Sequence, residues 1–84
     1  MEQFAFQSEA FGELQRLVDS LYTGHDQVDR LDVMVQAEIL DLPDDLLEIV
    51  SLLPPGNYER SRMCDQLNSA LAAHGWGNLY GTVE

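Results

Sequence analysis

The spacing of hydrophobic residues predicts a helix near the start of the chain. Between residues 4 and 22, apolar residues recur at intervals of seven, three, four and three positions, as on one face of a helix. The members of this stripe are Phe4, Phe11, Leu14, Val18 and Leu21. Ser8 is a candidate N-cap if the helix begins late, and Gly24 is a suitable stop.

Two periodicities compete over residues 26–40. A helical stripe is formed by Val28, Leu31, Val35, Ile39 and Leu42, with Asp26 as its N-cap. A strand pattern covers residues 33–39, where Val33, Val35, Ala37 and Ile39 alternate with Met34 and with polar residues. We predict a helix, because the helical stripe is longer and has a capping residue in front of it.

Residues 42–76 carry the strongest local signal, two helices separated by a rigid stop. Asp41 is placed to cap the first of them, and Pro43 suits its first turn. Pro54-Pro55-Gly56 then ends it, because proline cannot continue a helix. The second runs from about residue 58 to 74 and ends at Gly75. The expected inward residues are Leu46, Ile49, Val50 and Leu53, then Met63, Leu67, Ala70 and Leu71.

These elements predict one compact all-α domain, residues 1–84, built as a small bundle of about four helices. The last six residues, 79–84, are too few for a helix of useful length. They either pair with residues 4–6 as a minor two-stranded connection of the termini or lie flat on the core.

The net charge of the chain indicates which kinds of partner it can bind. Its 84 residues include fifteen acids and four arginines, with no lysine, for a net charge of −11. Residues 1–53 hold twelve of the acids and two of the arginines, a net charge of −10. Such a body repels nucleic acid and anionic membranes and attracts basic proteins. Halophilic adaptation or plain solubility would account for the same charge without a partner.

A dense group of acids in the middle of the chain is the leading candidate for a partner-binding face. Its members are Asp26, Asp29, Asp32, Asp44, Asp45 and Glu48. On a helix, residues three apart lie about 5–6 Å from each other on one face, a spacing comparable to the phosphates of a nucleic-acid strand. Anti-restriction and anti-CRISPR inhibitors carried by phages and mobile elements are similar in size and charge. We therefore expect a DNA mimic that inhibits a basic nucleic-acid-handling protein.

Two other binding functions fit the sequence. Arg60 and Arg62 begin the second helix of a pair that resembles a helix-turn-helix in outline, which would make the chain a DNA-binding regulator. The same two arginines could instead form ion pairs with the acids of the preceding helix, Asp44, Asp45 and Glu48. Exposed together, Trp76 and Tyr80 would anchor an adaptor or assembly domain on its partner.

No motif in the sequence predicts catalysis, a cofactor or a metal. Cys64 is a lone cysteine without zinc spacing, so we expect a buried apolar residue, although Arg60 one turn earlier would favour a thiolate. His25 and His74 lie at helix ends and are expected to act as caps. We find neither a signal peptide nor an apolar run of membrane-spanning length. We expect a non-enzymatic cytoplasmic protein, monomeric or homodimeric, without cofactor or metal.

Overall fold

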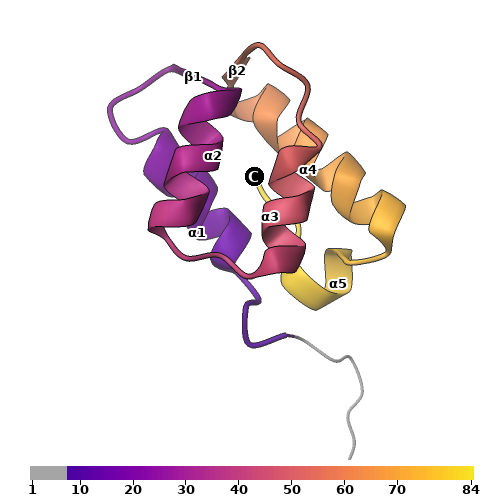
Figure 1. Ribbon diagram of the computed structural model, residues 1–84. Coiled ribbons are helices and arrows are strands. Elements are labelled where there is room, and N and C mark those ends of the chain that lie inside the picture. Colours follow the sequence, from indigo (N-terminus) through magenta and orange to yellow (C-terminus); the bar gives the residue numbers. More distant parts are fainter. Residues whose placement is uncertain (1–7) are drawn as a thin grey trace, which may run out of the picture.

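Five helices and one pair of short strands make up residues 8–84, the part of the chain described by the computed structural model (Figure 1). In chain order they are α1 (Glu13–Leu21), β1 (Gln27–Asp29), α2 (Arg30–Ile39), α3 (Asp44–Ser51), β2 (Asn57–Glu59), α4 (Arg60–His74) and α5 (Gly77–Tyr80). The mainly helical fold expected from the sequence is confirmed. Helix α2 also confirms the choice of helix over strand for residues 33–39.

The helices are arranged around a central pair. Helices α2 and α3 lie side by side and run in opposite directions, joined by a short connection at one end (Figure 1). Helix α1 packs against α2, and α4 packs against α3. The strands lie together at the end where α2 begins, whereas α5 lies at the opposite end (Figure 1).

The two strands pair antiparallel in a register that places Val28 opposite Tyr58. Both of these central side chains are buried, and each strand leads directly into a helix. The expectation that residues 79–84 hold no helix is wrong for Leu79 and Tyr80, which belong to α5. Residues 81–84 form no strand, and Val83 is buried against the core, as in the second of the two courses left open for this segment. Residues 4–6, the other half of the predicted pairing of the termini, lie outside the described residues.

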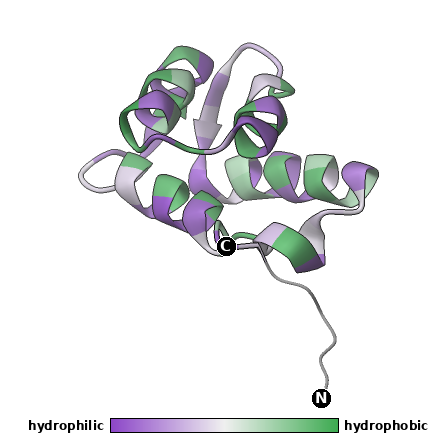
Figure 2. Cartoon of the chain, turned by 60° about the horizontal axis from the view of Figure 1, so that its bottom comes forward, coloured by the Kyte–Doolittle hydropathy of each residue, from purple (hydrophilic) through white to green (hydrophobic). Residues whose placement is uncertain are grey.

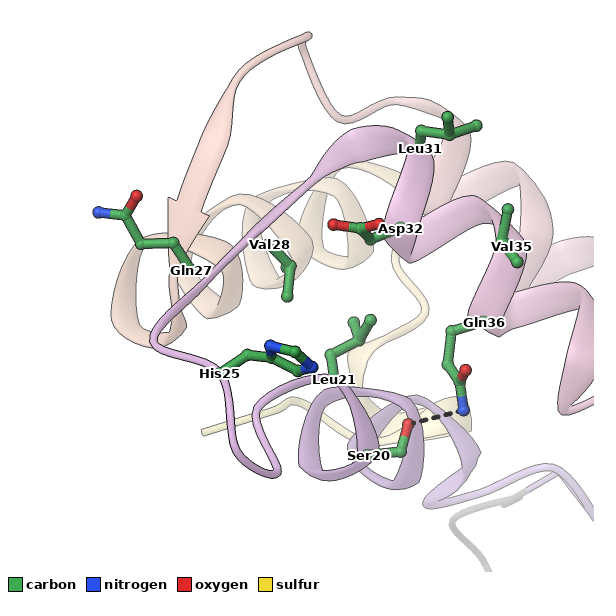
Figure 3. Close-up of a pocket in the computed structure, with 9 residues that line it drawn as sticks. All are labelled: Ser20, Leu21, His25, Gln27, Val28, Leu31, Asp32, Val35 and Gln36. Atoms are coloured by element: carbon green, nitrogen blue, oxygen red, sulfur yellow. Dashed lines mark hydrogen bonds between the residues drawn. The ribbon is translucent and has the colours of Figure 1, made fainter.

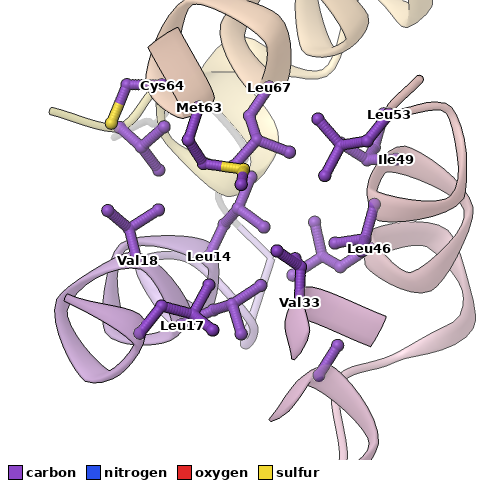
Figure 4. Packing of buried hydrophobic residues seen from close by; sticks show 14 of the residues in the cluster. Leu14, Leu17, Val18, Val33, Leu46, Ile49, Leu53, Met63, Cys64 and Leu67 are labelled. Carbon is purple, nitrogen blue, oxygen red and sulfur yellow. The ribbon is translucent and has the colours of Figure 1, made fainter. Parts of the chain in front are cut away.

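One hydrophobic core joins all five helices and both strands. Figure 4 shows side chains from α1, α2, α3 and α4 converging on it, and Figure 2 shows hydrophobic and hydrophilic residues side by side on the longer helices. The inward residues predicted for the last two long helices are buried, except that Ala70 is only half-buried. Leu14, Val18 and Leu21 are buried as predicted, but Phe11 is exposed.

The predicted inward face of α2 is wrong. Its buried residues are Val33 and Ala37, whereas the exposed fractions of Leu31, Val35 and Ile39 are 69%, 49% and 68%. The predicted stripe assumed one continuous helix from Val28 to Leu42. Both ends of the stripe are buried, but Val28 belongs to β1 and Leu42 follows the helix. They therefore say nothing about which side of α2 faces inward.

The ends of the helices differ from the predicted ones in their capping residues. Asp29, and not Asp26, caps α2: its Oδ1 accepts the Asp32 backbone N–H at 2.8 Å. The Asp32 Oδ2 accepts the Asp29 N–H at 3.1 Å in return, so the two acids form a reciprocal capping box.

The caps of α1 and α3 also fall elsewhere than predicted. Pro43, and not Asp41, occupies the N-cap of α3. Helix α1 begins after Gly12, and the Ser8 hydroxyl accepts only the N–H of Ala10, before the helix starts. Gly75 ends α4 as predicted, in the left-handed conformation with a φ of 71°.

The capping box gives a direct stability test. Asp29→Ala removes the side chain that accepts the first-turn N–H of α2, so we expect the free energy of unfolding to fall by about 1 kcal/mol. Asp26→Ala removes the same charge three residues earlier and should change that free energy by less than about 0.5 kcal/mol. Urea denaturation followed by circular dichroism measures both. Equal losses in the two variants would contradict the assignment of the cap.

Candidate functional site

Two of the predicted partner-binding acids are joined to the predicted aromatic interface. Asp45 and Glu48 lie one turn apart on α3 and face the end of α4 and helix α5. The Tyr80 hydroxyl donates to Asp45 Oδ2 at 2.5 Å, and this hydrogen bond raises the pKa of Tyr80. Tyr80 is buried and Trp76 half-buried, so this pair does not form an exposed aromatic anchor.

His74 completes this cluster, which we call the α3–α5 brace (Asp45, Glu48, His74, Trp76 and Tyr80). Its Nδ1 lies 3.0 Å from the Ala70 carbonyl oxygen, and its Nε2 lies 3.0 Å from Glu48 Oε2. Both partners are acceptors, so both contacts are satisfied only by the doubly protonated imidazolium. The Ala70 carbonyl and then the Glu48 carboxylate accordingly raise the pKa of His74.

The aromatic rings fill the space between the polar contacts of the brace. The ring of Trp76 lies against His74 with 4.5 Å between centroids, and Tyr80 meets Trp76 edge-on at 5.7 Å. The brace therefore connects the first turns of α3 to the C-terminal end of α4. It is a structural contact between elements far apart in sequence. Four of its residues had been placed on two separate binding surfaces by the sequence analysis, and the fifth, His74, had been expected to cap a helix.

The arginines do not pair with the acids that the sequence analysis suggested. The Arg60 guanidinium contacts Asp19 Oδ1 at 2.5 Å and the Glu84 main-chain oxygen at 2.8 Å. The Arg60 hydrogen bond, followed by one from Gln15, lowers the pKa of Asp19. Arg62 is exposed on the first turn of α4. The predicted bridge from Arg60 to α3 is therefore wrong.

Arg30 is also occupied within the fold. Its Nε donates to the Leu53 carbonyl at 2.8 Å and one of its terminal nitrogens to the Ser51 carbonyl at 2.9 Å. The cation thus satisfies carbonyl oxygens at the C-terminal end of α3, where positive charge is favourable. Its charge is directed towards α3 and away from the outer surface of α2.

The six candidate acids are all exposed, but they fall into two groups. Asp29 caps α2 and Asp32 lies in its first turn, and Asp44, Asp45 and Glu48 lie at the beginning of α3. Asp26 precedes β1 and is on no helix, so the predicted row of three acids along one helix face is wrong. The two helices are antiparallel, so their beginnings are separated by the length of α2, about 15 Å. Four of the acids hold hydrogen bonds in the capping box or the brace. Asp26 and Asp44 make no side-chain hydrogen bond within residues 8–84.

A groove of about 370 Å³ runs beside α2, bordered by β1 and the C-terminal end of α1 (Figure 3). Its apolar lining residues are Leu21, Val28, Leu31 and Val35, and its polar ones are Ser20, His25, Gln27, Asp32 and Gln36. Gln36 Nε2 donates to Ser20 Oγ at 3.3 Å and so ties α2 to α1. Sequence reasoning missed this feature because it placed Leu31 and Val35 in the core.

Cys64 and the metal-ligating side chains were the remaining candidates for chemistry in the sequence. Cys64 is buried, and burial raises the pKa of its thiol despite the nearby Arg60, which contradicts the suggestion of a thiolate. Burial likewise raises the pKa of Tyr22 to about 12. Within residues 8–84, no three His, Cys, Asp or Glu side chains are grouped closely enough to hold a metal ion.

Comparison with protein-family models, with curated proteins and with solved structures finds no significant match. None of the helices within residues 8–84 combines the length and the apolar character needed to cross a membrane.

The brace predicts a stability that depends on pH. The pKa of His74 is raised in the folded protein, so its contribution to the free energy of unfolding is complete below the ordinary value of 6.5. It is lost as the pH rises through the folded pKa. The difference in urea stability between wild type and His74→Gln should therefore shrink between pH 6 and pH 8.

Two further variants test whether the contact with Glu48 raises the pKa of His74. Glu48→Gln should lower the pKa of His74, measured by titrating its ring protons with NMR, because it removes the carboxylate at Nε2. Asp41→Asn, which neutralises an acid with no part in the brace, is the matched control. A His74 pKa unchanged by Glu48→Gln would contradict the contact.

Proposed function

We propose that the chain is a non-enzymatic, acidic binding protein that docks on the basic surface of a protein that handles nucleic acid. We further propose that it acts in the cytoplasm as an inhibitor and occupies the groove in which that partner would hold DNA or RNA. The observation that carries this proposal is the exposure of all six acids near the starts of α2 and α3, with little positive charge to offset them.

The disposition of the arginines supports a negative outer surface. Arg16 contacts Glu13, Arg60 contacts Asp19, and Arg30 is turned towards main-chain carbonyls. Three of the four cations of the chain are therefore engaged within the fold. A net charge of −11 on a surface of 5106 Å² favours fast, salt-sensitive association with a basic protein.

The two acidic groups suit a partner that contacts DNA at separated phosphates. Asp29 and Asp32 lie at the start of α2 and Asp44, Asp45 and Glu48 at the start of α3, and the length of α2, about 15 Å, separates the two helix starts. Along one strand of duplex, that distance corresponds to about four or five phosphates. A partner with basic residues on both sides of a groove could therefore meet both groups at once.

The alternative functions have less support. A DNA-binding regulator needs Arg60, which contacts Asp19, and the eight residues between α3 and α4 exceed the three or four of a helix-turn-helix turn. An adaptor docking through Trp76 and Tyr80 would have to open the brace. The acidic binding function is therefore better supported than either alternative.

The proposal is tested with the partner that the immobilised protein captures from an extract of the source cells at low salt. Once purified, the partner should bind labelled protein with an affinity that falls steeply between 50 and about 300 mM salt. Excess duplex DNA should displace the labelled protein from the partner, because the protein and the DNA would occupy the same groove of the partner. Binding of equal strength at both salt concentrations, or binding unaffected by DNA, would reject nucleic-acid mimicry.

Single charge reversals locate the contact. Asp26→Lys and Asp44→Lys change exposed acids without side-chain hydrogen bonds in the described chain, and each should weaken binding by about 0.2–1 kcal/mol. Asp65→Lys makes the same change of net charge on α4 and is the matched control. If all three variants weaken binding equally, net charge alone explains the affinity and the α2–α3 surface is not the contact.

A further inference from the structure

Helix α2 carries a ridge of aliphatic side chains on its exposed side. Leu31, Val35 and Ile39 follow one another at intervals of four residues, so they stand in a row along one face. The row extends about 12 Å, or two helical turns. Single exposed aliphatic residues are ordinary, but three in a row, continuous with the apolar part of the groove at Val28, form a contiguous surface.

The second half of the chain provides an internal comparison for this ridge. Residues of β1–α2 and of β2–α4 that differ by thirty in number occupy equivalent positions, beginning with the paired Val28 and Tyr58. The buried residues of the two helices correspond: Val33 to Met63 and Ala37 to Leu67. The two strand–helix units therefore present equivalent faces inward and outward.

At the three ridge positions the two units differ in chemistry. The counterparts of Leu31, Val35 and Ile39 are Ser61, Asp65 and Ser69, all exposed. A strand–helix unit of this geometry thus folds with polar residues on its outer face. The fold does not require aliphatic side chains there, so the ridge is free to serve a contact outside residues 8–84.

The surroundings of the ridge are negative. Asp29, Asp32 and Glu38 are exposed on the same helix, and the nearest cation along the chain, Arg30, donates to carbonyls of Leu53 and Ser51. A second copy of this chain would bring another net charge of −11 towards these acids. Charge complementarity therefore selects an occupant that is apolar in the middle and basic at its margins.

We propose that the ridge and the groove beside it bind an amphipathic helix of the partner protein. The apolar face of that helix lies along Leu31, Val35 and Ile39, and one of its side chains enters the groove beside Val28. Lysine or arginine residues on its margins meet Asp32 and Glu38. The basic character of the occupant rests on the proposed function, whereas the apolar contact does not.

The test uses a labelled synthetic peptide of leucine and lysine, eighteen residues long, with leucines spaced to form one helical face. A scrambled peptide of the same composition is its control. Fluorescence anisotropy should show binding of the first peptide, and the triple variant Leu31→Ser, Val35→Asp, Ile39→Ser should bind it at least about tenfold more weakly. This variant carries the residues that α4 has at the equivalent positions.

The triple variant separates apolar contact from charge attraction. Val35→Asp makes the net charge −12, one unit more than the −11 of the wild type, which would strengthen a purely electrostatic complex. Equal or tighter binding of the peptide by this variant, or equal binding of the scrambled peptide by the wild type, would overturn the proposal. Phe11→Ser removes an exposed apolar side chain beside Gly81, far from α2 in sequence, and should leave the affinity unchanged. Circular dichroism confirms that each variant is folded.

Two outcomes distinguish this inference from the proposed function. If the triple variant binds the captured partner normally while Asp26→Lys and Asp44→Lys weaken it, the ridge inference fails and the acidic function stands. If the triple variant loses the partner while salt and charge reversal have no effect, the apolar contact stands and the acidic function fails. Sedimentation that finds a wild-type dimer, dissociated by the triple variant, would replace the partner helix by a second copy and overturn the proposed occupant.

Discussion

The antiparallel pairing of β1 with β2 is the constraint on which the rest of the structure depends. It joins residues thirty positions apart and fixes where α2 and α4 begin. A two-stranded ribbon of this length is not stable alone, so it persists only because the helices bury Val28 and Tyr58 between them. The Tyr22 hydroxyl adds a bond to the Tyr58 carbonyl at 2.8 Å, which ties the end of α1 to the same point. The pairing of the strands and the packing of the hydrophobic core therefore depend on each other.

The parts of the fold that could be predicted from the sequence are those where proline and glycine end a helix. The helices on both sides of Pro54-Pro55-Gly56 were placed correctly to within a few residues, because proline and glycine act locally. The inward face of α2 could not be read in the same way. Val28 lies in a strand that exists only through its pairing with residues 57–59, and this long-range contact sets the helix start. The predicted hydrophobic stripe crossed the boundary between β1 and α2, so it combined residues of a strand with residues of a helix.

The candidate site was predictable in composition but not in arrangement. The acids were expected to be exposed, and they are. Their division into two groups depends on the antiparallel course of α2 and α3 and on the start of α2 at Arg30, which follows from the pairing of β1 with β2. The contact of His74 with Glu48 spans 26 positions and follows from how α4 lies against α3. A residue that the sequence marks as a charged surface candidate can thus be part of an internal brace.

Charge and apolar surface have different roles in a complex formed on α2. Long-range attraction from the acids accelerates encounter and is screened by salt, whereas desolvation of aliphatic side chains mainly slows dissociation. The ridge of Leu31, Val35 and Ile39 lies on the helix whose beginning carries Asp29 and Asp32. A partner drawn in by the acids would therefore arrive beside the surface that can retain it. Acids without such a ridge would give fast but short-lived complexes, and a ridge without acids would invite self-association.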